Sequence, residues 1–364
     1  GYSGQKARYG RWDPEGYMES YLPQKKDESS FAYKDRCRLE GHGSSTYELG
    51  MTALCVLAFT GAGYTREDSE FGVNISAALD YILRCQDVSG AFMSPRRPSY
   101  GDMYDHAISL LAICDYLAMT GDEEFRGPAV KGVQALLSLQ QPHGGWDYKV
   151  YAPAEQVARS DQSITGYCLM ALSAAHASGI HVPTTVMARI QAYISEAVYI
   201  DGRGIYANAG ISVGRSSLGM TAVNLLSRRM LGQGFEDETQ RKQVRLLVKE
   251  LPDWARADDL NHDPYQWYYT SLALIMEGGK DWDAFNIAMK RALVTSQEKA
   301  KGPRKGSWPP RTHYSRDGSG GRIYSTAMSV LCLEVYYRYV PEFLMAVAQE
   351  YAGLWKKPKT SGRE

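Results

Sequence analysis

Side chains suited to catalysis or ligand binding recur at or just before the first turns of predicted apolar helices. A histidine beside a carboxylate is the arrangement that a general base needs. The candidate catalytic residues are therefore Asp105, His106 and Asp161. Aromatic and arginine side chains at the same places could hold an anionic or carbonyl-bearing ligand. The candidate ligand-binding residues are Tyr104, Arg215, Trp267, Tyr268, Arg322 and Tyr324.

A structural role competes with each of these assignments. Acidic residues at helix N-termini act as caps that contribute about 1 kcal/mol each, which would explain Asp105 and Asp161. Arginine does not fit that role, because a cation at a helix N-terminus opposes the helix dipole. Arg215 and Arg322 therefore require either an acidic neighbour or an anionic ligand. A single histidine on a helix, such as His106, is also often only a satisfied polar group.

No set of residues has the types and spacing of a metal site. The densest acidic run is Asp258-Asp259-Leu260-Asn261-His262-Asp263, which a solvated loop before a helix explains. Magnesium requires oxygen ligands, and zinc favours cysteine and histidine; neither set can be assembled here. We therefore expect no metal and no cofactor.

These residues belong to a repeated unit. Six apolar segments share small residues and a threonine near their starts, and equivalent positions recur at intervals of about 55 residues. We align Thr52, Ala107, Thr165, Thr221, Thr270 and Thr326. The pattern predicts inner helices that begin near residues 47, 104, 162, 217, 266 and 323.

A second, amphipathic helix follows each apolar one, as in 128–140, 183–198 and 239–251. Helices that are apolar on all sides belong inside, and those with one apolar face belong outside. Six such hairpins close into a double-walled ring, so we expect an all-α toroid. Long connections, 87–103, 141–160, 199–215, 252–265 and 298–322, all precede inner helices. We expect the candidate residues to converge at this mouth of the ring.

Composition sets the remaining bounds. Lysine plus arginine and aspartate plus glutamate each number 41, so no global charge attracts nucleic acid. Twenty-six tyrosines and seven tryptophans against eight phenylalanines suit a wet, aromatic cavity wall. No apolar run is long enough to span a bilayer. Unpaired cysteines in apolar helices slightly favour the cytoplasm, whereas an anchor removed from before Gly1 would favour the cell envelope.

The domain organisation follows from the repeat. Residues 1–42 are polar and tyrosine-rich and lie outside it, so we expect an N-terminal arm that wraps the ring. Residues 43–355 form the predicted toroid, and 356–364 a loose tail.

The ends of the predicted outer helices resemble the QW motif of squalene–hopene and oxidosqualene cyclases. The best copy ends in Gln140-x3-Gly144-x-Trp146, with Ala135 in place of the family's aromatic residue. Weaker copies end at Phe92, Gly202 and Trp308. The motif secures a helix end, because glycine permits the turn and the glutamine amide can bind the next hairpin. This resemblance, over roughly residues 40–355, implies the α/α toroid of the terpenoid cyclase and prenyltransferase superfamily.

The nearest resemblance is to uncharacterised bacterial prenyltransferase or squalene-oxidase repeat proteins, which carry no activity to transfer. The Asp-x-Asp-Asp acid of the class II cyclases is absent. The aspartate, cysteine and histidine that hold zinc in protein prenyltransferases are absent too, and Ser325 stands where their histidine would be. Whether the protein is an enzyme is left open, with binding favoured over catalysis.

Three functions follow from these observations. The first is a toroid that binds an extended apolar or carbohydrate-like ligand in an aromatic-lined central cavity. The second is a non-catalytic scaffold that presents its loops to a protein partner, and the third is a divergent terpenoid cyclase. A cavity with convergent polar groups would favour the first. A filled centre with an exposed apolar patch would favour the second.

Overall fold

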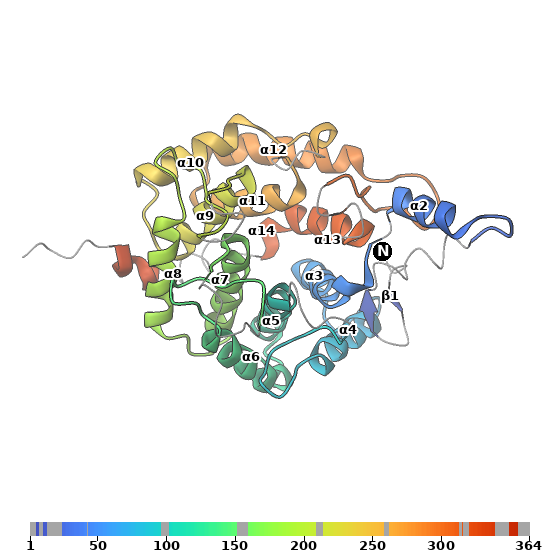
Figure 1. Cartoon of the computed structure of the whole chain (residues 1–364), viewed down its shortest axis with the longest axis horizontal. Helices are drawn as coiled ribbons and strands as arrows, with labels where there is room; N and C mark the ends of the chain where they lie inside the picture. The colour runs from blue at the N-terminus through green and yellow to red at the C-terminus, as the bar shows by residue number, and fades with distance from the viewer. Residues whose placement is uncertain are drawn as a thin grey trace, which may run out of the picture.

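A computed structural model places most of the chain. It describes residues 5–6, 10–12, 24–41, 43–95, 102–150, 159–208, 214–257, 262–312, 315, 320–338 and 349–355. Six mostly apolar helices form a central ring (Figure 1). They are α3 (Glu48–Gly61), α5 (Asp102–Thr120), α7 (Gln162–Ala177), α9 (Leu218–Met230), α11 (Pro264–Glu277) and α13 (Gly321–Leu333). Each begins within two residues of its predicted start.

The inner ring is closed. Every inner helix contacts the next one along the chain, and α13 returns to contact α3. Neighbouring helices pack through small residues, as where Gly166 of α7 meets Val223 of α9. The prediction of an all-α toroid is therefore confirmed.

Five amphipathic helices form the outer wall and follow one another around the ring in Figure 1. Each begins soon after an inner helix ends and buries one face against the inner wall. They are α4 (Gly72–Arg84), α6 (Arg126–Ser138), α8 (Thr184–Glu196), α10 (Glu238–Lys249) and α12 (Gly279–Ser296). Short 3-10 turns, η2 (Ser45–Tyr47), η3 (Glu123–Phe125) and η4 (Trp254–Arg256), precede three of the helices.

The residues of the Gln-x3-Gly-x-Trp pattern tie consecutive hairpins together. The Gln140 amide donates to the carbonyl of Gly144 at 2.9 Å and to that of Val186 in α8 at 3.2 Å. The Trp146 indole donates to Leu136 O at 2.8 Å, and its backbone N–H donates to Thr165 Oγ1 of α7 at 3.1 Å. This copy of the motif thus joins α6, at whose end it lies, to the next outer helix, α8, and to the next inner helix, α7.

The N-terminal residues that the structure describes pack against the first hairpin of the ring. Strands β1 (Gln5–Lys6) and β2 (Arg11–Trp12) pair antiparallel, and Trp12 N donates to Thr52 Oγ1 of α3 at 2.9 Å. The buried Glu48 carboxylate accepts from Tyr81 at 2.8 Å and pairs with Arg11 at 2.9 Å. Helix α2 (Ser30–Glu40) follows. The Tyr17 and Tyr21 that we assigned to the arm lie outside the described residues.

After α13 the chain turns into α14 (Val335–Arg338), which contacts α11, α13 and α3. The turn η5 (Ala352–Trp355) lies at the C-terminal end of α9, where the Trp355 indole donates to Leu231 O at 2.9 Å. The predicted tail, 356–364, lies outside the described residues. All six cysteines are unpaired and buried. No described helix has both the length and the apolar character to cross a membrane.

Candidate functional site

A cluster of polar and aromatic side chains surrounds the first turn of α7. Asp161 is the N-cap residue, and its buried carboxylate accepts from Ser163 N at 2.9 Å and from Ile164 N at 3.3 Å. It also accepts from Ser163 Oγ at 2.5 Å and pairs with Arg159 at 3.1 Å. The capping role expected for Asp161 is therefore present, and the carboxylate is simultaneously the centre of an ion pair.

Arg159 connects this cap to the loops around it. Its guanidinium also pairs with Asp147, and it lies over the rings of Tyr148 and Tyr206 at 5.4 and 5.9 Å from their centroids. The two tyrosine hydroxyls contact each other. Arg159, Tyr148 and Tyr206 are half-buried, so each side of the cluster keeps some contact with solvent. A cation held above two aromatic faces is a stabilised arrangement.

A layer of tyrosine rings continues from this cluster across the centre of the ring. The Tyr104 hydroxyl hydrogen-bonds Ser163 Oγ at 2.7 Å, and its ring packs edge-on against Tyr148 and Tyr167. Tyr167 in turn lies 5.8 Å from Tyr269 of α11. Tyr167 is 3% exposed and Tyr269 is fully buried, so this part of the centre is packed rather than open.

Burial controls the ionisation of the cluster. It raises the pKa of Asp161, although the hydrogen bonds from Ser163 and the charge of Arg159 oppose the rise. Burial also raises the pKa of Tyr206 to about 12 and that of Tyr104 well above its usual value. The tyrosines therefore present neutral hydroxyl groups, which can donate or accept hydrogen bonds to a ligand.

Asp105 and His106 do not form the acid–base pair that their adjacency suggested. Asp105 accepts from Gly50 N of α3 at 3.0 Å and so joins two inner helices. His106 turns toward the outer wall, where its Nδ1 accepts from Phe92 N at 3.1 Å and its ring stacks on that phenylalanine. Complete burial lowers the pKa of His106 to about 4. It is a neutral structural acceptor in the place that Thr165 occupies on α7.

The remaining candidates point in different directions. Trp267 is fully buried against Trp254, 6.1 Å away, which leaves no surface for a ligand. Tyr268 is 2% exposed and packs against Tyr269. The guanidinium of Arg322 donates to Ser307 Oγ at 3.1 Å, away from Asp161. Arg215 is exposed, and Tyr324 is half-buried on the first turn of α13. Of the predicted set, Tyr104 and Asp161 lie in one cluster.

Three members of the cluster, Asp147, Tyr148 and Tyr206, were missed in the sequence. They lie in connections rather than at helix starts. The available signal was their position directly after a motif copy, since Asp147 and Tyr148 follow Trp146.

The described residues contain no group of three or more histidine, cysteine, aspartate or glutamate residues that could hold a metal ion. Of the acidic run before α11, residues 258–261 lie outside the described part. Asp263 caps α11 by accepting from Gln266 N at 2.9 Å, and His262 contacts Glu250 at 3.3 Å. These two residues have structural partners.

Comparisons with known proteins identify the fold. No protein-family model and no curated protein matches the sequence. Among solved structures, an α-1,6-mannanase of Salegentibacter sp. HEL1_6, bound to α-1,6-mannotriose, is 10% identical over 90% of this chain and 97% of its own, with a TM-score of 0.57. Cellobiose 2-epimerase from Spirochaeta thermophila is 14% identical over 83% and 87%, with a TM-score of 0.54.

A type II terpene cyclase from Scytonema, bound to geranylgeranyl dihydroxybenzoate, is 14% identical over 80% of this chain and 87% of its own, with a TM-score of 0.52. All three similarities cover most of both chains at low identity. They show that this protein has the fold of an α/α toroid; a shared fold alone does not transfer a function.

Proposed function

We propose that this toroid binds a hydroxyl-rich, carbohydrate-like ligand at the mouth, over the cluster of Tyr104, Tyr148, Arg159, Asp161 and Tyr206. The observation that carries the proposal is the half-buried ion-paired Arg159 between two tyrosine rings whose hydroxyls stay neutral. Sugars combine polar edges with apolar faces, and such a surface offers hydrogen bonds and ring faces together.

The packed tyrosine layer beneath the cluster favours a ligand that lies on the mouth. It does not favour an extended apolar chain that penetrates the centre, because Tyr167 and Tyr269 already occupy part of that space. Binding of a mannotriose by one toroid of similar fold is consistent with the proposal. The QW-like copies support a cyclase-related fold and a structural role, which makes a cyclase reaction the weaker candidate.

Isothermal titration with α-1,6-mannotriose, cellobiose and geranylgeranyl dihydroxybenzoate tests this function. We expect saturable binding of at least one sugar, with an affinity about tenfold lower in Tyr148→Phe and Tyr206→Phe, because each loses a hydroxyl group of the cluster. Tyr64→Phe, on a half-buried tyrosine beside α4, is the matched control. Binding of the terpenoid alone, or equal losses in the control, would reject a carbohydrate site at this cluster.

A scaffold function is favoured by a different observation, an apolar groove between the inner helices α3 and α13. It is described below.

A further inference from the structure

Each outer helix of the first three hairpins is held by the same close contact with a glycine. Gly10, Gly90 and Gly144 have φ between +70° and +93°, in the left-handed region, and their Cα atoms lie against the helix backbone. A Cβ on these glycines would stand 1.8 Å from Ala77 O, 2.5 Å from Lys131 O and 2.0 Å from Arg189 O, respectively. Each contacted residue is the sixth of its helix, in α4, α6 and α8.

A glutamine amide adds a second contact in the same register. Gln86 donates to Pro128 O at 2.9 Å and Gln140 donates to Val186 O at 3.2 Å, the third residues of α6 and α8. The loop at the end of one outer helix therefore specifies where the next outer helix lies. Gly202 repeats the glycine contact against Lys242 of α10.

The copy after α12 is fully formed but has no helix against it among the described residues. Gly306 has φ +82°, and the Gln297 amide donates to Gly306 O at 2.9 Å, as in the other copies. The Trp308 indole donates to Leu293 O at 2.8 Å. A Cβ on Gly306, however, would meet no described atom within 4 Å. No hydrogen bond joins Gln297 to another described outer helix.

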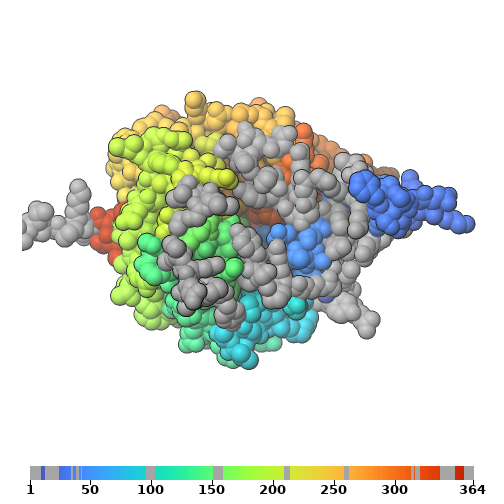
Figure 2. All heavy atoms as spheres, viewed as in Figure 1, coloured from blue at the N-terminus to red at the C-terminus, as the bar shows by residue number. Residues whose placement is uncertain are grey.

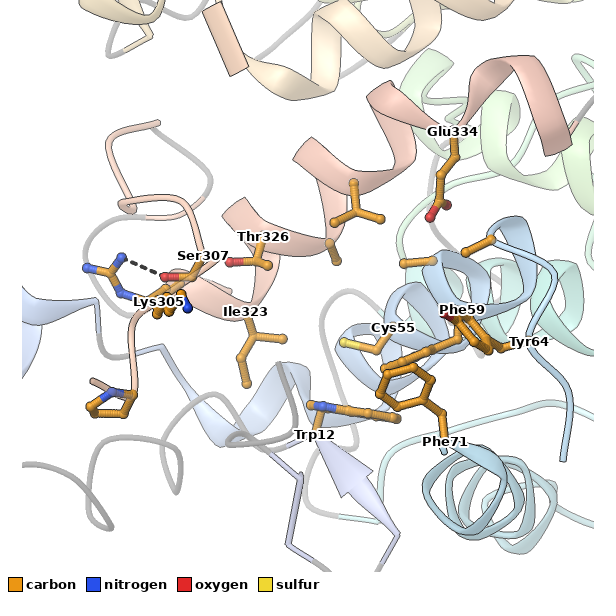
Figure 3. Close-up of a pocket in the computed structure, with 16 residues that line it drawn as sticks. Trp12, Cys55, Phe59, Tyr64, Phe71, Lys305, Ser307, Ile323, Thr326 and Glu334 are labelled. Carbon is orange, nitrogen blue, oxygen red and sulfur yellow. Dashed lines mark hydrogen bonds between the residues drawn. The ribbon is translucent and has the colours of Figure 1, made fainter. Parts of the chain in front are cut away.

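This motif copy borders an apolar groove between α13 and α3, which we call the seam groove (Figure 3). It encloses a cavity of about 300 Å³. On each wall the apolar side chains recur at the i, i+4, i+7 spacing of one helix face. They are Cys55 and Phe59 on α3 with Ala62 at its C-cap, and Ile323, Ala327 and Val330 on α13. Two facing helix stripes form the kind of groove that receives a third helix.

The described segments next to the seam groove do not fill it. After α13 the chain continues in α14, where Tyr336 packs against Trp282 and bonds Asn286 of α12. Helix α2 projects from the side of the molecule in Figures 1 and 2, and its Phe31 is 84% exposed. The outer wall therefore has five helices in the described part of the chain, around six inner ones.

The charge at the rim of the groove indicates which residues a helix bound there would carry in its first turn. The Gly306 and Gln297 contacts would meet its first two turns, and the loop between these two residues exposes Lys299, Lys301 and Lys305. Acidic residues near a helix N-terminus are stabilised by the helix dipole and here also by these lysines. An amphipathic helix with an acidic first turn therefore fits the site best.

We propose that the seam groove binds an amphipathic α-helix of a partner protein, which completes the outer wall as a sixth outer helix. Its third residue accepts a hydrogen bond from the Gln297 amide, and its sixth residue packs on Gly306. Its apolar face enters the cavity between α3 and α13. This interaction surface shares no residue with the cluster around Asp161 and does not depend on the proposed ligand.

The test uses the full chain and fluorescein-labelled peptides whose sequences already suit this type of site. A peptide of residues 237–250 carries the α10 sequence with Asp237 and Glu238 at its start, and one of residues 183–197 carries α8 without an acidic first turn. We expect saturable anisotropy changes with both, tighter binding of the acidic one, and loss of that preference at high salt. A scrambled peptide of the same composition should not bind.

Variants of the groove then locate the binding. Val330→Asp should weaken peptide binding about tenfold, because it places a charge on the apolar wall, and Gln297→Glu should weaken it because the amide donor is lost. Val294→Asp, at a 53% exposed site on α12, is the matched control and should bind as the parent does. Circular dichroism confirms folding of each variant.

Three outcomes would overturn the proposal. One is absence of saturable binding by both peptides, which would indicate that residues of this chain outside the described part cover the groove. The second is equal weakening by Val294→Asp. The third is sedimentation of the chain as a dimer that Val330→Asp dissociates, which would make a second copy the occupant.

Discussion

Two copies of the motif loop occupy contrasting places on this ring, and the segment from Gln297 to Gly306 is longer than that from Gln140 to Gly144. At Gly144 the loop supports α8, with a glutamine amide on Val186 and a glycine against Arg189. At Gly306 the loop has a similar backbone angle and an equivalent tryptophan contact, but the described residues place no helix against it. Among the described residues, the loop at Gly306 therefore keeps its conformation through its own residues and its helices, without an outer helix against the glycine.

A repeat protein usually caps such a surface, because an exposed apolar groove invites association. In this ring the inner wall closes through α13 and α3, so the fold does not need a sixth outer helix for closure. Among the described residues the seam carries no outer helix, and this is the surface for which we propose recognition.

The largest effect should come from the two motif tryptophans. Trp146→Ala and Trp308→Ala each remove a buried indole that bonds a helix carbonyl, so each should lower the free energy of unfolding by about 3–5 kcal/mol. Urea denaturation measures both. Near-equal losses would show that the open copy is as firmly folded as the occupied one. A much smaller loss at Trp308 would mean that the loop at the seam is not preformed.

A second prediction concerns His106, which replaces the threonine acceptor in one copy. Its folded pKa of about 4 lies below the unfolded value of about 6.5, so the unfolded chain binds the extra proton in between. The contribution of neutral His106 to the free energy of unfolding is complete above pH 6.5 and is lost as the pH falls toward 4. His106→Thr keeps an acceptor but does not titrate. Between pH 7 and pH 4 the free energy of unfolding should thus fall by about 3 kcal/mol more in the parent than in this variant.

Denaturation at several pH values, with the exposed His181→Thr as control, measures that difference. Identical pH profiles for the parent and His106→Thr would contradict a buried, neutral His106.

A smaller effect distinguishes the two glutamines. Gln140→Ala leaves Val186 O without its amide donor and should cost about 1–3 kcal/mol. Gln297→Ala removes one contact within its own loop and should cost about 1 kcal/mol or less. Thermal unfolding of the pair measures this. A loss at Gln297 that equals the loss at Gln140 would indicate an outer helix already in place at the seam.

Much of the ring could be read from the sequence. Apolar periodicity is a property of single helices, so all six inner helices and their starts were predictable. The alignment of the six segments is wrong by one residue in one repeat. It pairs Ala107 with Thr165, whereas His106 accepts the equivalent hydrogen bond. A histidine and a threonine look unrelated in sequence, and only their shared role as acceptor reveals the equivalence.

The candidate site was less predictable. Position at a helix start does not determine which face a side chain occupies. Trp267 packs on Trp254 and Arg322 bonds Ser307. Tyr104 and Asp161, in contrast, both hydrogen-bond Ser163. Trp12 was also overlooked as a motif residue. The Gly10-x-Trp12 pattern lies in the segment that we placed outside the repeat, and its bond to Thr52 shows the role.

The most direct test of the comparison substitutes the two glycines. Gly144→Ala and Gly306→Ala both place a Cβ at positive φ, which costs about 1–2 kcal/mol each. Only at Gly144 does the Cβ also collide with a helix, 2.0 Å from Arg189 O. Urea denaturation should therefore show Gly144→Ala to be the more destabilised by about 2 kcal/mol or more, with Gly306→Ala near the backbone cost alone. Equal losses would contradict an open sixth position.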